Sequence, residues 1–173
     1  FQQQLDQDRA KFILSQFRAR GLFTDHGPNV SVNGNASNPH YEPSREACAV
    51  IRRGDIVLID LWAKLDRAHG VYYDITWMGY CGATPPASYL NVFNIVREAR
   101  DRAIRCVQDR AASGKLLRGF EVDDAARDYI RRQGYGDYFF HRTGHSIGTD
   151  VHGFGGDGEL WLVGVHISPY EKG

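Results

Sequence analysis

Residues 54–82, GDIVLIDLWAKLDRAHGVYYDITWMGYCG, contain two apolar runs separated by a polar turn. The first run includes Ile56 to Ile59, and the second is rich in β-branched and aromatic residues, a composition typical of strands. The turn, DRAHG, ends at Gly70. This pattern predicts a β-hairpin, around which the rest of the fold is expected to assemble.

The two predicted strands of this hairpin each carry an aspartate. If they pair symmetrically about Arg67, Asp60 lies directly opposite Asp74, because both are equally far from the turn. Directly opposed residues share a face, with Cβ atoms about 4.5–5.5 Å apart, and like charges this close repel each other. Three readings follow: divalent cations lie between the carboxylates, as in two-metal hydrolases; one aspartate faces solvent; or each pairs with an arginine.

Three helices are expected in the rest of the chain. Apolar residues recur at helical spacing in 5–20, 88–112 and 121–133, and a glycine follows each segment as a stop signal. The stretch 26–44, rich in Gly, Asn and Pro, is expected to be loop with at most one short strand. Strands, helices and then further short strands favour an α+β domain with an antiparallel sheet. The predicted apolar faces are Ala10, Ile13, Leu14 and Phe17; Tyr89, Val92, Phe93, Val96, Ala99, Ala103 and Val107; and Val122, Ala125, Ala126, Tyr129 and Ile130.

Composition narrows the class of protein. With 173 residues, 42% of them hydrophobic, the chain can bury a core, and a single domain is expected. A net charge of zero argues against nucleic acid or an anionic membrane as the main partner, and the arginine-rich segment 97–110 favours a solvated helix with i,i+4 charge pairs. Three cysteines without C-x-x-C spacing favour reduced, mostly buried thiols in a cytoplasmic protein. The first residue is Phe1, which suggests a fragment.

Residues 139–153, FFHRTGHSIGTDVHG, hold three of the chain's seven histidines. His145 lies between two glycines and is a candidate neutral nitrogen ligand for a divalent metal. His141 and His152 are candidate proton carriers or substrate contacts, since histidine titrates near neutral pH. Each of the three histidines also has a purely structural reading.

Five segments, in order along the chain, resemble the pita-bread metallopeptidases: aminopeptidase P, prolidase and methionine aminopeptidase. The resemblance runs from about residue 5 to residue 153 and is strongest to the Xaa-Pro branch. It implies a pita-bread (creatinase/aminopeptidase-like) fold, an antiparallel sheet covered by helices, in one catalytic-type domain spanning 1–173 and incomplete at its C-terminal end. The segments are NASNPHYEP, VLIDLWAKL, VYYDITW, GFEVDDAARDYI and HRTGHSIGTDVHG.

The resemblance also implies functional roles. It makes Asp60, Asp74 and His145 ligands of two divalent ions (Mn, Co, Zn or Fe) and makes His152 the residue that stabilises the tetrahedral intermediate and carries a proton. His40 and His141 are the implied substrate-pocket histidines. The implied activity is an aminopeptidase or dipeptidase that cleaves the N-terminal bond of a peptide with proline in second place, through a hydroxide held by both metals. Relatives are often homodimers.

Three features depart from the family pattern. The aspartates are further apart in sequence than usual, and Trp62 replaces the usual glycine, where it either narrows a pocket or packs on the sheet. The tail 154–173 matches nothing in the family and lacks its two glutamate ligands, which leads to the expectation that this chain alone is poorly active or inactive. Glu159 and Glu171 are the remaining candidate carboxylates, and Ser168 stands where a glutamate belongs.

Two alternatives from other functional classes stay open. A pita-bread domain can serve as a non-catalytic binding module, and a creatinase-like amidinohydrolase shares the fold without needing metal. Retention of both aspartates, His145 and His152 counts against each of these readings. Metal dependence separates them from the peptidase.

Overall fold

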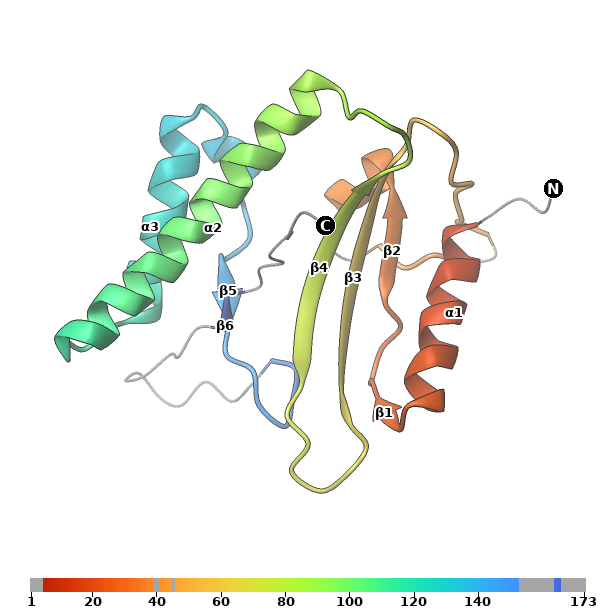
Figure 1. Ribbon diagram of the computed structural model, residues 1–173, viewed down its shortest axis with the longest axis horizontal. Coiled ribbons are helices and arrows are strands. Elements are labelled where there is room, and N and C mark those ends of the chain that lie inside the picture. The colour runs from red at the N-terminus through yellow and green to blue at the C-terminus, as the bar shows by residue number, and fades with distance from the viewer. Residues whose placement is uncertain (1–4, 39–40, 45, 153–163, 166–173) are drawn as a thin grey trace. The chain divides into compact units, whose positions relative to one another are not determined.

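A computed structural model describes residues 5–38, 41–44, 46–152 and 164–165, and its elements are drawn in Figure 1. The chain divides into two compact units, the first ending at Pro85 and the second beginning at Pro86. The first unit contains α1 (Asp6–Ala19), β1 (Leu22–Phe23), β2 (Asn29–Val32), the short 3-10 helix η1 (Asn33–Ser37), β3 (Ile56–Leu65) and β4 (Tyr73–Tyr80). The second contains α2 (Ala87–Ser113), α3 (Gly119–Arg132), η2 (Gly136–Tyr138), β5 (Gly144–His145) and β6 (Gly164–Val165).

The predicted hairpin forms the centre of the first unit. β3 pairs antiparallel with β4 along one side and with β2 and β1 along the other (Figure 1). The stretch 26–44 contains one short strand, β2, as predicted. The expected α+β class with an antiparallel sheet is therefore confirmed.

The predicted register of the hairpin is wrong by two residues. Asp60 lies opposite Thr76, and Asp74 lies opposite Trp62, so the hairpin is symmetric about Ala68 rather than Arg67. The backbone of the turn explains the shift: Arg67 N–H donates to the Leu65 carbonyl at 2.8 Å, and Gly70 N–H donates to the Arg67 carbonyl at 3.1 Å. The tight part of the loop thus lies on the β3 side.

Alternate residues of the strands divide the sheet of the first unit into two chemically different faces. One face packs on α1, and Ala10 of that helix buries itself against Val30 and Val57. Burying such apolar surface contributes about 25 cal/mol per Å². Residues opposite one another in the ladders share a face, so the remaining face is the polar one. It consists of Asn29, Ser31, Leu58, Asp60, Trp62, Asp74, Thr76 and Met78.

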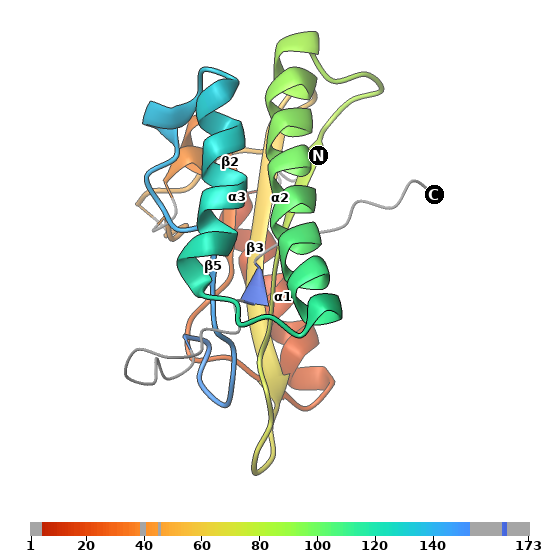
Figure 2. The same ribbon diagram turned by 90° about the vertical axis from the view of Figure 1, so that its left-hand side faces the viewer.

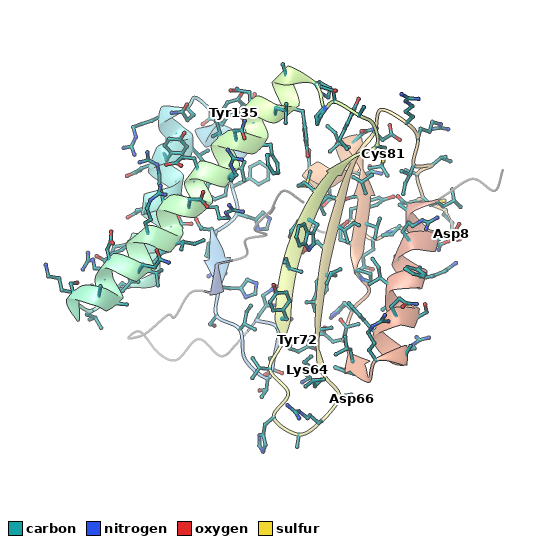
Figure 3. The ribbon with its side chains drawn as sticks, viewed as in Figure 1. Asp8, Lys64, Asp66, Tyr72, Cys81 and Tyr135 are labelled. Carbon is teal, nitrogen blue, oxygen red and sulfur yellow. The ribbon has the colours of Figure 1, made fainter. Side chains whose placement is uncertain are left out.

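Figure 3 shows Lys64, Asp66 and Tyr72 at the loop end of the hairpin and Cys81 at its other end. The Lys64 ammonium lies 5.0 Å from the centre of the Tyr72 ring and 5.6 Å from that of Phe23. These cation–π contacts tie the loop end to β1.

Replacing Gly70 with alanine is expected to lower the free energy of unfolding by about 1–3 kcal/mol. A Cβ atom at this position would lie 2.3 Å from the Leu65 carbonyl oxygen, so the turn must open. Urea unfolding followed by circular dichroism measures the loss. Gly34→Ala is the control, because a Cβ there meets no atom within 4 Å. Equal unfolding midpoints for the two variants would contradict the prediction.

In the second unit α2 and α3 lie side by side (Figure 2). Small residues let the two helix backbones approach: Ala99 and Ala103 of α2 are buried, as is Ala126 of α3. The predicted face of α3 is confirmed, but the predicted face of α2 is partly wrong. Ile95, which continues the i+4 row of the alanines, is buried instead of Val96, which is 55% exposed. The buried cluster between the two helices consists of Ile95, Ala99, Ala103, Val122, Ala126 and Ile130.

The predicted helix stops are confirmed at Gly21, Gly114 and Gly134, which all adopt positive φ angles. Glu98 pairs with Arg102 one turn along α2, as expected for a solvated helix. No helix within the described ranges is long and apolar enough to cross a membrane.

The three cysteines are free, but they are half-buried rather than buried as predicted. Burial raises the pKa of the Cys106 thiol above its usual value, which keeps that thiol protonated near neutral pH.

Candidate functional site

Asp60 and Asp74 lie on the polar face of the hairpin, on neighbouring strands. Because the register is shifted by two residues, they are diagonal neighbours rather than directly opposed. Such a diagonal separates Cα atoms by about 7–8 Å and Cβ atoms by somewhat less. Carboxylates extend about two bonds beyond Cβ, so their oxygens can reach a shared centre between the strands. The correction in register therefore keeps the predicted pair on one face.

Thr76 is a residue of this site to which the sequence analysis assigned no role. Its hydroxyl donates a 2.7 Å hydrogen bond to Oδ1 of Asp60, directly across the strand pair. A hydrogen bond of this kind restrains the rotamer of a carboxylate. Thr76 is the third residue of the Asp-Ile-Thr sequence, so the motif did contain the signal.

Trp62 lies on the same face, directly opposite Asp74. Its indole N–H donates a 3.0 Å hydrogen bond to Oδ1 of Asp25, in the loop between β1 and β2. Burial opposes ionisation of Asp25, but the hydrogen bonds from Trp62, from the Asp25 backbone and from His26, together with the charge interaction with His26, outweigh it and lower the pKa of the carboxyl below its usual value. An ionised Asp25 thus holds the indole beside the two aspartates.

Two buried polar side chains of β2 extend this polar face. Asn29 is 5% exposed and lies directly opposite Asp60, and Ser31, two residues further along, is fully buried. Within the described part of the chain, neither Asn29 Oδ1 nor Ser31 Oγ has a hydrogen-bond partner. Buried polar atoms normally have a partner, which can be an ordered water or ion. Asp60 therefore lies beside buried polar side chains and not in an apolar core.

The loop that carries His40 is anchored by the next residue. His40 itself lies outside the described residues, but the Tyr41 hydroxyl donates a 2.8 Å hydrogen bond to Oδ2 of Asp6, which is fully buried at the start of α1. Burial, together with this hydrogen bond, raises the pKa of Tyr41 to about 12. Tyr41 therefore stays protonated and tied to α1 at neutral pH.

In the second unit, His145 is the last residue of β5, which pairs with β6. Its Nδ1 lies 2.9 Å from the carbonyl oxygen of Ser146. A carbonyl oxygen only accepts, so this contact requires the proton on Nδ1, and the neutral tautomer with that proton has its lone pair on Nε2. This tautomer suits a metal ligand, because ligating histidines almost always donate their other N–H to a fixed acceptor.

The structure brings two of the predicted histidines together. The rings of His145 and His152 have centroids 4.6 Å apart and are inclined by 44°. His152 is exposed to solvent. His141 is exposed as well, and its ring is tilted against Phe140 with a centroid separation of 6.3 Å.

The predicted metal ligands come from both units: Asp60 and Asp74 from the first, His145 from the second. Within the described ranges of either unit, no three His, Cys, Asp or Glu side chains form a group that could hold a metal ion. Glu159, Ser168 and Glu171 lie outside the described residues. The predicted ligands are two carboxylates and an imidazole, and these donor types fit the chemistry of Mn, Co, Zn or Fe. The ligand set remains a prediction.

The sequence was compared with protein-family models and with known proteins, and it matches one family of metallopeptidases. The model of metallopeptidase family M24 matches residues 3–160. A Xaa-Pro dipeptidase of Lactobacillus helveticus is 32% identical over 123 residues, covering 71% of this chain and 30% of that protein. A Xaa-Pro dipeptidase of Pyrococcus furiosus is 37% identical over 102 residues, covering 59% of this chain and 26% of that protein. The chain thus spans about a third or less of these two relatives.

Solved structures agree with the sequence comparison. A dipeptidase from Pyrococcus horikoshii superposes with a TM-score of 0.74 at 33% identity, covering 91% of this chain and 41% of that one. An X-Pro aminopeptidase from Thermotoga maritima has a TM-score of 0.72 at 28% identity, with 87% and 39% covered. These neighbours confirm the expected pita-bread fold, of which this chain covers a part.

Proposed function

We propose, since the chain belongs to metallopeptidase family M24, that it forms part of a metal-dependent peptidase of the Xaa-Pro aminopeptidase or dipeptidase type. The observation that carries the proposal is the polar face of the hairpin. Asp60 and Asp74 share it, and Thr76 holds Asp60 by a 2.7 Å hydrogen bond. Two like charges kept on one face, with buried polar atoms around them, suit the binding of cations.

In this proposal Asp60, Asp74 and His145 hold divalent ions. When bound, such ions lower the pKa of a water molecule and polarise the carbonyl of the scissile bond. Asp60 is oriented by Thr76, and His145 presents Nε2 because its Nδ1–H donates to the Ser146 carbonyl. Hydrogen bonds therefore restrain the orientation of both side chains before a ligand binds, and this lowers the entropy cost of binding.

His152 is proposed as the proton carrier. Its exposed ring lies beside that of His145, so a proton on His152 is close both to this predicted ligand and to solvent. His40 and His141 are proposed as substrate contacts. The substrate class, a peptide with proline in second position, rests on the names of the relatives, which are Xaa-Pro dipeptidases.

The direct test is metal binding by the whole chain. The chain is incubated with excess Co²⁺, freed of unbound metal and analysed for ions per chain by mass spectrometry, and hydrolysis of a Xaa-Pro dipeptide is assayed in parallel. The proposal expects the chain to retain Co²⁺. It also expects that a chelator abolishes any hydrolysis that is observed. A chain that retains no Co²⁺ would overturn the proposed metal site and favour the binding module or the metal-free amidinohydrolase.

Tryptophan fluorescence provides a second readout of where the metal binds. Trp62 lies on the face of the aspartates, whereas Trp77 lies opposite Ile59 on the face that packs on α1. Co²⁺ is expected to quench the parent and Trp77→Phe strongly, but Trp62→Phe only weakly, while all three retain the same amount of metal. Equal quenching in the two variants would place the ion away from the polar face.

A further inference from the structure

Asp123 and Arg127 of α3 form a two-point ion pair in the second unit. They lie one helical turn apart and meet at two points, Nε to Oδ2 at 2.6 Å and Nη2 to Oδ1 at 3.1 Å. Their side chains are only 23% and 17% exposed. On the same helix, Arg131 and Asp128 make a single contact of 3.5 Å with side chains 60% and 53% exposed. The first pair is thus built differently from an ordinary surface pair.

Both members of the pair also hold the segment that follows η2. Arg127 donates to the Phe139 carbonyl at 2.6 Å and to the His141 carbonyl at 2.8 Å. Asp123 Oδ1 accepts from the backbone N–H and from the hydroxyl of Thr143, each at 2.8 Å. The guanidinium also lies 4.5 Å from the centre of the Phe139 ring.

The backbone of 139–143 forms no helix or strand, so it lacks the hydrogen bonds that regular structure would supply. Side chains of α3 supply them instead. They fix the backbone on both sides of His141 and, through Thr143, the residue that leads into β5 and His145. The planar fork of an arginine suits this role because it can donate to two carbonyls and a carboxylate at once, which an ammonium cannot do in the same geometry.

We infer that Asp123 and Arg127 are positioning residues that set the places of the His141 and His145 rings relative to α3. The role of these rings in metal and substrate binding rests on the proposed function, but the positioning itself does not. Groups that orient a ligating histidine typically change metal affinity or activity about 10- to 100-fold when they are removed.

The test compares Asp123→Asn and Arg127→Lys with matched changes in the exposed pair of the same helix, Asp128→Asn and Arg131→Lys. Each full-length variant is first confirmed as folded by circular dichroism. Histidine ring signals are then recorded in metal-free protein by ¹H–¹³C correlation spectroscopy, and Co²⁺ affinity is measured by titration. We expect the His141 and His145 signals to move and Co²⁺ affinity to fall about 10- to 100-fold in the first two variants only.

Arg127→Lys keeps the charge and the pairing with Asp123, so it decides the matter if Asp123→Asn does not fold. Unmoved His141 and His145 signals, or equal movement in the control pair, would overturn the inference. If the parent binds no Co²⁺, the proposed function fails, while the ring signals still decide whether α3 positions the histidines.

Discussion

Replacing Asp74 with asparagine is expected to lower the Co²⁺ affinity of the chain by about 100-fold or more, while leaving the metal-free chain as stable as the parent or more stable. The loss corresponds to about 2.7 kcal/mol of binding free energy. The two effects have opposite signs because Asp74 shares the polar face with Asp60. Without a cation the two charges repel each other, and with one they both attract it.

Asparagine keeps the shape and the acceptor oxygen of aspartate, so the variant removes charge rather than volume. Titration calorimetry with Co²⁺ gives the affinity, and urea unfolding with a chelator gives the stability of the metal-free chain. Asp66→Asn is the matched control: it removes the same charge from an exposed position in the hairpin loop. If Asp74→Asn destabilises the metal-free chain and leaves Co²⁺ affinity unchanged, Asp74 has a structural role and not a ligand role.

The hairpin illustrates how far the sequence could predict this site. Two apolar runs rich in strand-forming residues were enough to predict both strands, and pairing about the turn between them predicted the shared face of the aspartates. The register could not be read in the same way, because it depends on which backbone groups close the loop, here Arg67 to Leu65 and Gly70 to Arg67. An error in the centre of the turn by one residue shifts the pairing by two, which preserves the face and changes only the neighbour. The residue opposite Asp60 is consequently Thr76 and not the predicted Asp74.

The α2 helix shows a second limit. Its apolar residues cover more than one side, and periodicity alone did not decide which side is buried. The alanines at 99 and 103 decide it, since they let α3 approach closely, and the row through them leads to Ile95 rather than Val96.

The role of Asp123 and Arg127 could not be predicted from the sequence, for a different reason. On a helix, an aspartate and an arginine at i,i+4 spacing have the pattern of an ordinary solvated pair, like Glu98 and Arg102. What distinguishes them is the loop that returns over α3 and places the Phe139 and His141 carbonyls in reach of the guanidinium. That contact is tertiary, so no local pattern encodes it.

Replacing Asp123 with alanine is expected to lower the free energy of unfolding at neutral pH by about 3 kcal/mol. The change leaves the Arg127 guanidinium, the Thr143 N–H and the Thr143 hydroxyl without the carboxylate they all contact. Urea unfolding of the parent and the variant measures the difference. The control is Asp128→Ala, whose 53% exposed side chain makes one long contact and is expected to contribute less than about 0.5 kcal/mol.

The pH dependence of this difference identifies the charge as its source. Burial alone would raise the pKa of Asp123, but hydrogen bonds from Arg127 and Thr143 outweigh burial and lower it below its usual value of 3.8. A carboxyl whose pKa is lower in the folded than in the unfolded chain stabilises the fold fully above the unfolded pKa and loses that contribution as pH falls through the folded pKa. The difference between parent and Asp123→Ala should therefore be constant from about pH 5 to 7 and shrink below about pH 4. If the difference in unfolding free energy persists unchanged into acid, Asp123 acts by its shape and neutral contacts. Its charge would then not hold residues 139–143.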